Sequence, residues 1–187
     1  LVTRLTRGVE SLLENAGVEL VEGRAEFAGS DSARVVHGGD GQGSQSVAFE
    51  HAVIATGSRP IELPGFEFDG TNMLSSRDAL ALDNVPDSLV VVGAGYIGME
   101  LATVFAKMGS DVTVIEQLSD ALPGYEDDVT AVVRERAAGL GVDFYFDHGA
   151  EGWTESADGI EVRASGPDGE VALSADGTIG LVGAPFD

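Results

Sequence analysis

The residues with the clearest capacity for chemistry form a glycine-rich segment near the middle of the chain. It has the spacing G-x-G-x-x-G and consists of Gly93, Ala94, Gly95, Tyr96, Ile97 and Gly98. In such a loop the first glycine permits a tight turn, the second leaves room for a pyrophosphate, and the third lets a helix pack closely on a strand. The N-terminus of that helix presents free N–H groups and a positive dipole end to phosphate oxygens. The spacing therefore predicts the phosphate-binding loop of a dinucleotide site.

Glu116 indicates which dinucleotide this loop would bind. It follows Gly98 by 18 residues, close to the spacing of an acid that accepts hydrogen bonds from the adenosine ribose hydroxyls. A carboxylate there repels a 2′-phosphate, and no Lys or Arg occurs between Lys107 and Arg134. The pattern favours NAD over NADP. The alternatives are a glycine-rich turn that binds nothing and an exposed acid at a strand end.

Hydrophobic patterns predict the elements that position this loop. We expect strands over 88–92, 111–115 and 142–146, with helices over 95–108 and 127–140 between them. The order β-α-β-α-β predicts an α/β fold, a Rossmann-like NAD-binding domain with a parallel sheet and helical crossovers. Further strands are expected over 153–181.

The first third of the chain has a different pattern. It predicts a helix ending near Gly17, then short strands over 18–22, 24–28, 33–37 and 46–54, with a glycine-rich loop over 38–44. A connector with two prolines and two glycines spans 58–72, and a short helix is expected over 77–82. The expected domains are 1–62 and 63–187.

The charge is strongly acidic. The chain has 10 Lys and Arg against 32 Asp and Glu, a net charge of −22. This field repels nucleic acids and anionic membranes, so neither is an expected partner. It is typical of cytoplasmic proteins of extreme halophiles, in which molar salt screens the repulsion; an acidic protein of ordinary cytoplasm is the alternative.

Several classes of site and segment are excluded or not predicted. No run approaches 18 apolar residues, as a membrane-spanning helix needs, and no leader pattern is visible at the N-terminus. Cysteine is absent, so these residues hold no disulfide, Cys-ligated metal or thiol nucleophile. His37, His51 and His148 lack ligand spacing, and no metal is predicted.

Two longer segments resemble the flavoprotein disulfide reductases. GAGYIGMELATVFAKMGSDVTVIE, followed by LPGYEDDV, is similar to the NAD domain of that family. HAVIATGSRP, from His51 to Pro60, is similar to its A-T-G-S-x-P segment, where the chain passes beneath the flavin and leaves the FAD domain. Within the family, the acid after the second strand and the L-P motif are most like the dihydrolipoamide dehydrogenase branch.

The resemblance implies which residues contact the cofactors. On the FAD side they are Ala25, Ala55, Thr56, Gly57 and Ser58, all in the later portion of an FAD-binding domain. On the NAD side, Tyr96 and Ile97 would lie where the nicotinamide meets the flavin, and Gly149 and Gly183 would offer backbone contacts. Glu100 would pair with a lysine beside the flavin; the alternatives are an ordinary helix glutamate and, for Ile97, core packing.

The resemblance also implies the activity. Dihydrolipoamide on a lipoyl carrier protein would reduce a redox disulfide, the dithiol would reduce FAD, and FAD would pass hydride to NAD in a homodimer. The redox cysteines and the His-Glu base pair are expected outside this chain, which we interpret as an internal fragment without a catalytic residue. The alternatives are an NADH oxidase or peroxidase type of flavoprotein and a non-catalytic NAD-binding module.

One departure from the family pattern lies near the C-terminus. The family closes its NAD domain with V-G-R-x-P, whereas residues 182–185 read Val-Gly-Ala-Pro and lack the arginine. Gly177 and Gly180 are expected to weaken the strand before this motif, because glycine in a strand offers no side chain to pack.

Overall fold

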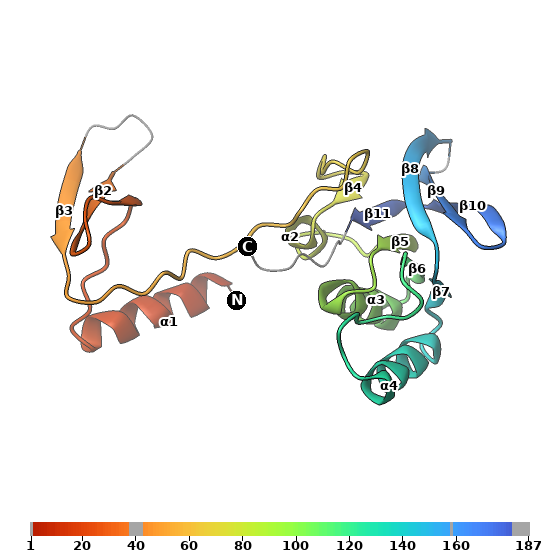
Figure 1. Ribbon diagram of the computed structural model, residues 1–187, viewed down its shortest axis with the longest axis horizontal. Coiled ribbons are helices and arrows are strands. Elements are labelled where there is room, and N and C mark those ends of the chain that lie inside the picture. Colours follow the sequence, from red (N-terminus) through yellow and green to blue (C-terminus); the bar gives the residue numbers. More distant parts are fainter. Residues whose placement is uncertain (1, 38–42, 158, 181–187) are drawn as a thin grey trace. The chain divides into compact units, whose positions relative to one another are not determined.

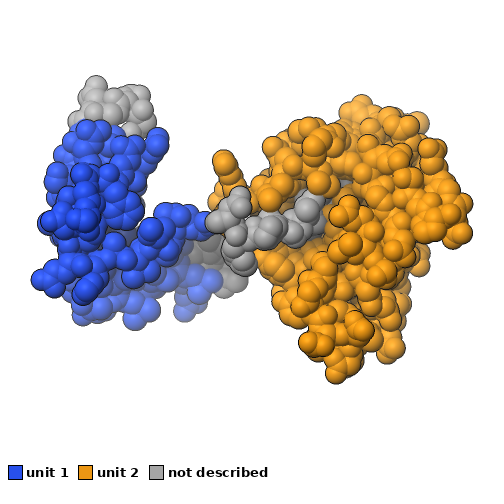
Figure 2. Space-filling view, in the orientation of Figure 1, with its two compact units in different colours: residues 1–57 blue, residues 58–187 orange. Residues whose placement is uncertain are grey.

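The computed structural model describes residues 2–37, 43–157 and 159–180, and Figure 1 labels its helices and strands. These residues group into two compact units, 1–57 and 58–187 (Figure 2). The boundary lies five residues before the expected one, and the assignment of the units to FAD-binding and NAD-binding domains stays a prediction. Gly183 and most of the 38–44 loop lie outside the described residues.

The first unit contains one helix, α1 (Val2–Asn15), and one antiparallel sheet. The sheet has the order β1-β2-β3, with the strands β1 (Arg24–Phe27), β2 (Ser32–Val36) and β3 (Ser44–Ala48). Among the described residues of this unit only Val35 is buried. The unit therefore has almost no hydrophobic core of its own.

Two strand predictions in the first unit are wrong. Residues 18–22 form no strand, and the strand predicted over 46–54 ends at Ala48. The segment 49–60 contains no helix or strand, and Val53 and Ile54 are 91% and 72% exposed. β-Branched residues favour a strand only where a neighbouring strand or core packs against them, and the described residues supply neither here.

A five-stranded sheet organises the second unit, as the α/β pattern predicts. Its order is β4-β11-β5-β6-β7, and each neighbouring pair is parallel. The strands are β4 (Met73–Leu74), β5 (Ser88–Val92), β6 (Asp111–Ile115), β7 (Asp143–Tyr145) and β11 (Gly177–Gly180). Despite its two glycines, β11 forms a ladder with β4 on one side and β5 on the other, because backbone pairing needs no side chain.

The remaining elements are three helices and a second sheet. The helices are α2 (Ser76–Ala79), α3 (Tyr96–Met108) and α4 (Asp127–Ala138). The second sheet is antiparallel, with the order β10-β9-β8, and its strands are β8 (Gly149–Ser156), β9 (Gly159–Gly166) and β10 (Gly169–Ala175). No helix among the described residues has the length and apolarity to cross a membrane.

Alternate residues of β5 face opposite layers of the unit. Leu89 and Val91 belong to a core cluster with residues of α3 and α4, whereas Val90 and Val92 pack in a cluster with residues of β9 and β10. Because side chains alternate along a strand, a continuous apolar run is needed to cover both faces. The parallel sheet is thus buried between helices and the antiparallel sheet (Figure 1).

Local side-chain chemistry accounts for small shifts in the helix bounds. The short helix predicted over 77–82 lies instead at 76–79, because Ser75 and Asp78 form a reciprocal capping box at its start. α4 begins at Asp127 as predicted but ends at Ala138, two residues early. α3 ends at Met108. The next residue, Gly109, has a φ of 104°, the left-handed conformation that commonly follows the end of a helix.

Candidate functional site

The glycine loop, residues 93–98, forms the turn between β5 and α3 together with the start of α3. Gly93 has a φ of 105°, a left-handed conformation that disfavours residues with a side chain. Gly98 is buried, and a Cβ there would collide with the carbonyl oxygen of Gly93 and lie 3.5 Å from Cγ1 of Val91. The third glycine therefore permits α3 to start directly against the loop that precedes it.

The N-terminus of α3 carries no competing acceptor of its own. Gly95 is the N-cap residue in an extended conformation, no side chain caps it, and the first turn has no acid. The backbone N–H of Met99 donates to the carbonyl oxygen of Gly95 at 2.9 Å. The N–H groups before Met99, in the first turn of the helix, have no intrahelical acceptor. This arrangement suits a phosphate, because the N–H groups and the helix dipole both favour an anion.

Glu116 is buried at the carboxyl end of β6, next to the glycine loop. Glu116 is only 8% exposed, so the alternative interpretation, an exposed acid at a strand end, is wrong. Oε2 accepts a hydrogen bond from the backbone N–H of Ala94 at 2.8 Å, and Oε1 accepts one from Leu118 N–H at 2.9 Å. A carboxylate has about four acceptor positions, so two hydrogen bonds leave capacity for the hydroxyl groups of a ribose.

The loop that follows Glu116, residues 117–126, also contacts the glycine loop. The backbone N–H of Leu122 donates to the carbonyl oxygen of Ala94 at 2.8 Å. Leu122 has a φ of 53°, an uncommon conformation for a residue with a side chain. Ala121 and Leu122 are both buried in the core cluster that contains α3 and α4.

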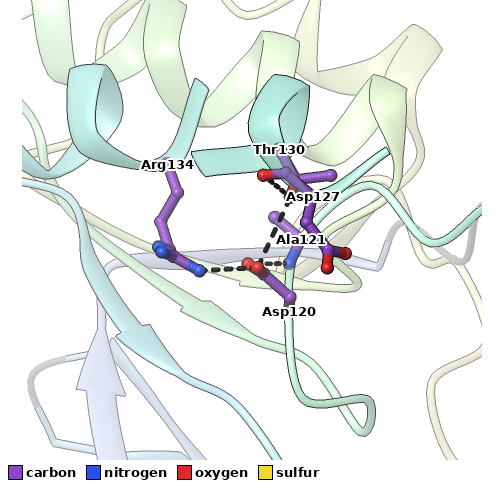
Figure 3. A network of polar contacts seen from close by, with 5 residues as sticks. All are labelled: Asp120, Ala121, Asp127, Thr130 and Arg134. Carbon is purple, nitrogen blue, oxygen red and sulfur yellow. Dashed lines mark hydrogen bonds and ion pairs between the residues drawn. The ribbon is translucent and has the colours of Figure 1, made fainter. Parts of the chain in front are cut away.

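An ion pair joins the 117–126 loop to α4 (Figure 3). Nη1 of Arg134 lies 2.6 Å from Oδ2 of Asp120, and both side chains are about one-third exposed, at 36% and 35%. Ala121 N–H donates to Oδ1 at 2.8 Å. Thr130 Oγ1 lies 3.4 Å from the same Oδ2, but its single hydrogen has a nearer acceptor in the carbonyl oxygen of Asp127, at 3.0 Å. Burial alone would raise the pKa of Asp120, but these hydrogen bonds and the Arg134 charge outweigh it and hold that pKa below its usual 3.8.

The predicted nicotinamide-side residues border an apolar groove on the surface of the second unit. Tyr96, Ile97 and Glu100 line this groove of about 790 Å³. Its other walls come from later residues of α3, the C-terminal end of α2, the 117–126 loop and α4. Among the lining residues are Leu80, Val104, Leu122, Tyr125, Val129 and Val133. Tyr96 is 42% exposed, and Glu100 is exposed as well.

Gly149 lies close to Glu116 in the structure. It is the first residue of β8, and the preceding backbone N–H, of His148, donates to the carbonyl oxygen of Glu116 at 3.0 Å. The fold thus places Gly149 near the backbone of Glu116, after the carboxyl end of β6. Its contact with NAD stays a prediction.

The FAD-side residues lie elsewhere in the chain. Ala25 is exposed on β1, and the stretch from Ala55 to Ser58 is exposed in a connector without helix or strand. Gly57 has a φ of 78° and open space around the position of a Cβ. The FAD contacts of these residues stay a prediction.

Sequence reasoning missed the contacts of Leu122 with the glycine loop and of Asp120 with Arg134. Asp120 and Arg134 are 14 residues apart on different elements, and Leu122 contacts Ala94 through its backbone. None of these contacts has a local sequence signal. The basic residue nearest after Glu116, Arg134, was the one available clue.

A parallel sheet with a glycine turn at the start of α3 and a buried acid after the next strand is the arrangement found in domains of the Rossmann type. A family model described as pyridine nucleotide-disulphide oxidoreductase matches residues 1–185. The chain belongs to this family.

Individual relatives agree with this membership. The chain is 64% identical over 167 residues to dihydrolipoyl dehydrogenase 2 of Haloarcula marismortui, which covers 89% of this chain and 35% of the relative. It is similar to the crystal structure of LpdA from Mycobacterium tuberculosis, with a TM-score of 0.82 and 26% identity over 97% of this chain and 40% of that one. A water-forming NADH oxidase from Lactobacillus brevis bound to NADH gives a TM-score of 0.65 and 25% identity, over 86% and 36%. The chain thus spans little more than a third of the length of these proteins.

Proposed function

We propose that this chain supplies the NAD-binding domain and the later portion of the FAD-binding domain of a dihydrolipoyl dehydrogenase. The observation that carries the proposal is the uncapped glycine turn at α3, joined to the buried Glu116 by the Ala94 hydrogen bond. The 64% identity to a dihydrolipoyl dehydrogenase supports the particular activity. The complete enzyme would transfer reducing equivalents from dihydrolipoamide on a lipoyl carrier protein to NAD.

The chemistry of hydride transfer belongs to FAD and NAD when they are bound. The residues of this chain bind and orient. Gly95 and the first turn of α3 would hold the pyrophosphate, and Glu116 would accept hydrogen bonds from the ribose hydroxyls. Tyr96 and Ile97 would border the nicotinamide, and Glu100 would place a charge near the flavin. No cysteine occurs in the chain, so the redox disulfide would come from another part of the polypeptide.

The exposed apolar surface of the first unit supports its role as part of a larger domain. Leu5, Val9 and Leu12 of α1 are 61%, 56% and 69% exposed. Burying such side chains stabilises each by about 1.5–3 kcal/mol, and the described residues of the unit leave them in water. We infer that the rest of an FAD-binding domain covers this face in the complete enzyme, which we propose is a cytoplasmic homodimer.

The proposal is tested with the complete enzyme and with this chain alone. The complete enzyme, purified in molar KCl, should reduce NAD with dihydrolipoamide. The chain alone should bind NAD saturably in calorimetry, carry no flavin absorbance and show no dihydrolipoamide turnover, because it contains no thiolate. Gly95→Val should abolish NAD binding, since its side chain occupies the place of the pyrophosphate. Turnover by the chain alone would contradict the assignment of the chemistry.

The second candidate is an NADH oxidase or peroxidase, which the similarity to the Lactobacillus brevis enzyme favours. The two functions differ in their substrates rather than in the NAD site. Oxygen or peroxide consumption with NADH, measured beside dihydrolipoamide oxidation in the same preparation, separates them. A complete enzyme with one redox cysteine and no activity on dihydrolipoamide would favour this second candidate.

A further inference from the structure

We propose that Asp120 and Arg134 are positioning residues for the dinucleotide site, acting through Leu122 and Ala94 on the glycine loop. Their ion pair would hold the 117–126 loop in the conformation that orients the Gly95 N–H. The inference rests on the proposed function, because it takes the glycine loop to bind the pyrophosphate of NAD. Neither residue lies in the glycine motif, and among the described residues neither forms a hydrogen bond or ion pair with it.

The first step is the way in which Ala94 is held. Its N–H donates to Glu116 and its carbonyl oxygen accepts from Leu122 N–H, each at 2.8 Å. The peptide that carries the Ala94 carbonyl also carries the Gly95 N–H, and a planar trans peptide points these two groups in opposite directions. The hydrogen bond from Leu122 therefore sets the direction of the Gly95 N–H. Gly95, on the other side of this peptide, has no Cβ and so restricts its orientation less than another residue would.

The second step is the conformation of Leu122. Its φ of 53° lies in the left-handed region, which is unfavourable for a residue with a Cβ. Such a conformation persists only where the surrounding structure holds it. Burial of Ala121 and Leu122 holds one side of the turn. Asp120, the residue before Ala121, is anchored on the other side by polar contacts.

The third step is the anchor itself (Figure 3). Arg134 and Thr130 are four residues apart on α4, so that both face Asp120. Arg134 donates to Asp120 at 2.6 Å, whereas the single hydroxyl hydrogen of Thr130 has a nearer acceptor in the Asp127 carbonyl oxygen, at 3.0 Å, than in Asp120, at 3.4 Å. The same carboxylate accepts the N–H of Ala121, which fixes the backbone at the start of the turn. Of the two ion pairs among the described residues, this one is the shorter, at 2.6 Å against 3.5 Å. It joins two elements, whereas the other joins neighbours on β1.

The test uses the complete enzyme with Arg134→Met, Asp120→Asn and the double variant. Arg136→Met is the matched control, because it removes the same charge from the same helix at an exposed residue that forms no ion pair among the described residues. Dissociation constants of NAD and of ADP, measured by calorimetry, should rise about two- to fivefold in each single variant, as expected for loss of a partly exposed ion pair. The dissociation constants of the double variant should be no higher than those of the single variant that binds more weakly, because the two residues act as one pair.

Two further readouts separate positioning from general stability. The KM for NAD should rise more than kcat falls, and the KM for dihydrolipoamide should not change. Hydrogen exchange of the Leu122 amide, measured without NAD, should be faster in Arg134→Met than in Arg136→Met. A lower thermal midpoint with unchanged NAD and ADP affinity, or additive effects in the double variant, would overturn the positioning role. If the wild-type enzyme itself binds no NAD, the proposed function is wrong, and the positioning role that rests on it is wrong as well.

Discussion

The buried carboxylate of Glu116 accepts a hydrogen bond from the backbone N–H of Ala94 at 2.8 Å, although 22 residues separate them. This contact joins the end of β6 to the turn between β5 and α3. The second oxygen holds Leu118 N–H at 2.9 Å, so one side chain fixes two loops. Glu116 therefore holds the glycine loop through its own hydrogen bonds, in addition to its proposed hydrogen bonds with ribose.

Replacing Glu116 should weaken both stability and NAD binding. Glu116→Ala leaves two backbone N–H groups without their acceptor, and an unsatisfied buried group costs about 1–3 kcal/mol. We expect a lower free energy of unfolding without NAD and a higher KM for NAD in the complete enzyme. Denaturant titration and steady-state kinetics measure the two effects.

The control for the stability effect alone is Glu100→Gln, which removes the same charge from an exposed position on α3. It should leave the free energy of unfolding within about 0.5 kcal/mol of wild type, as surface substitutions usually do. Equal stability of Glu116→Ala and Glu100→Gln would show that the Ala94 and Leu118 contacts do not hold the loops.

A methyl group at Gly98 should separate α3 from the glycine turn. Gly98→Ala places its Cβ against the Gly93 carbonyl oxygen, and overpacking of this kind costs about 1–3 kcal/mol. NAD affinity should fall with stability, because the turn and the helix N-terminus move together. Gly152→Ala is the matched control, since its Cβ would meet nothing closer than 4.0 Å. Wild-type stability in Gly98→Ala would refute the close approach of turn and helix.

Salt should stabilise the protein strongly. With a net charge of −22, the folded state repels itself at low ionic strength, and at molar salt the screening length falls to about 3 Å. The thermal midpoint should rise with KCl concentration up to the molar range. Sucrose, which is excluded from protein surfaces but carries no charge, serves as the control. A midpoint that does not respond to KCl would remove the interpretation of a halophilic protein.

The turn at Asp69 should depend on pH in the acid range. One oxygen, Oδ1, accepts the N–H groups of Thr71, Asn72 and Met73 at 2.8, 2.8 and 2.9 Å. Burial alone would raise the pKa of Asp69, but these backbone hydrogen bonds outweigh it and lower the pKa from its usual 3.8. A depressed folded pKa means that the stabilisation is complete above the unfolded pKa of about 3.9 and is lost as pH falls through the folded value.

The comparison of wild type with Asp69→Ala isolates this effect from the global charge. The difference between their thermal midpoints should stay constant from pH 7 to about pH 4.5 and narrow below about pH 3.9, where the unfolded carboxyl begins to protonate. A difference that narrows already between pH 7 and pH 5 would contradict a lowered pKa. Asp168→Ala, in the exposed turn between β9 and β10, serves as the control for loss of a charge.

The sequence alone determined the parallel sheet and its glycine turn. The apolar run at 89–92, and that at 112–115, interrupted only by Thr113, end where β5 and β6 end, because a strand that is buried on both faces is apolar at nearly every position. The spacing of Gly93, Gly95 and Gly98 placed the turn at the start of α3, since each glycine answers a local steric demand. Such features depend on residues that are close in sequence, and they can therefore be predicted from the sequence alone.

Only the tertiary structure decided what holds that turn in place. The contacts of Ala94 with Glu116 and Leu122, and of Asp120 with Arg134, join residues that lie on different elements. Their partners are set by the packing of β6, the 117–126 loop and α4, not by spacing along the chain. The failed strand predictions at 18–22 and 49–54 have the same origin, because a strand needs a partner that the local sequence does not supply. Periodicity is a property of the segment, whereas pairing is a property of the fold.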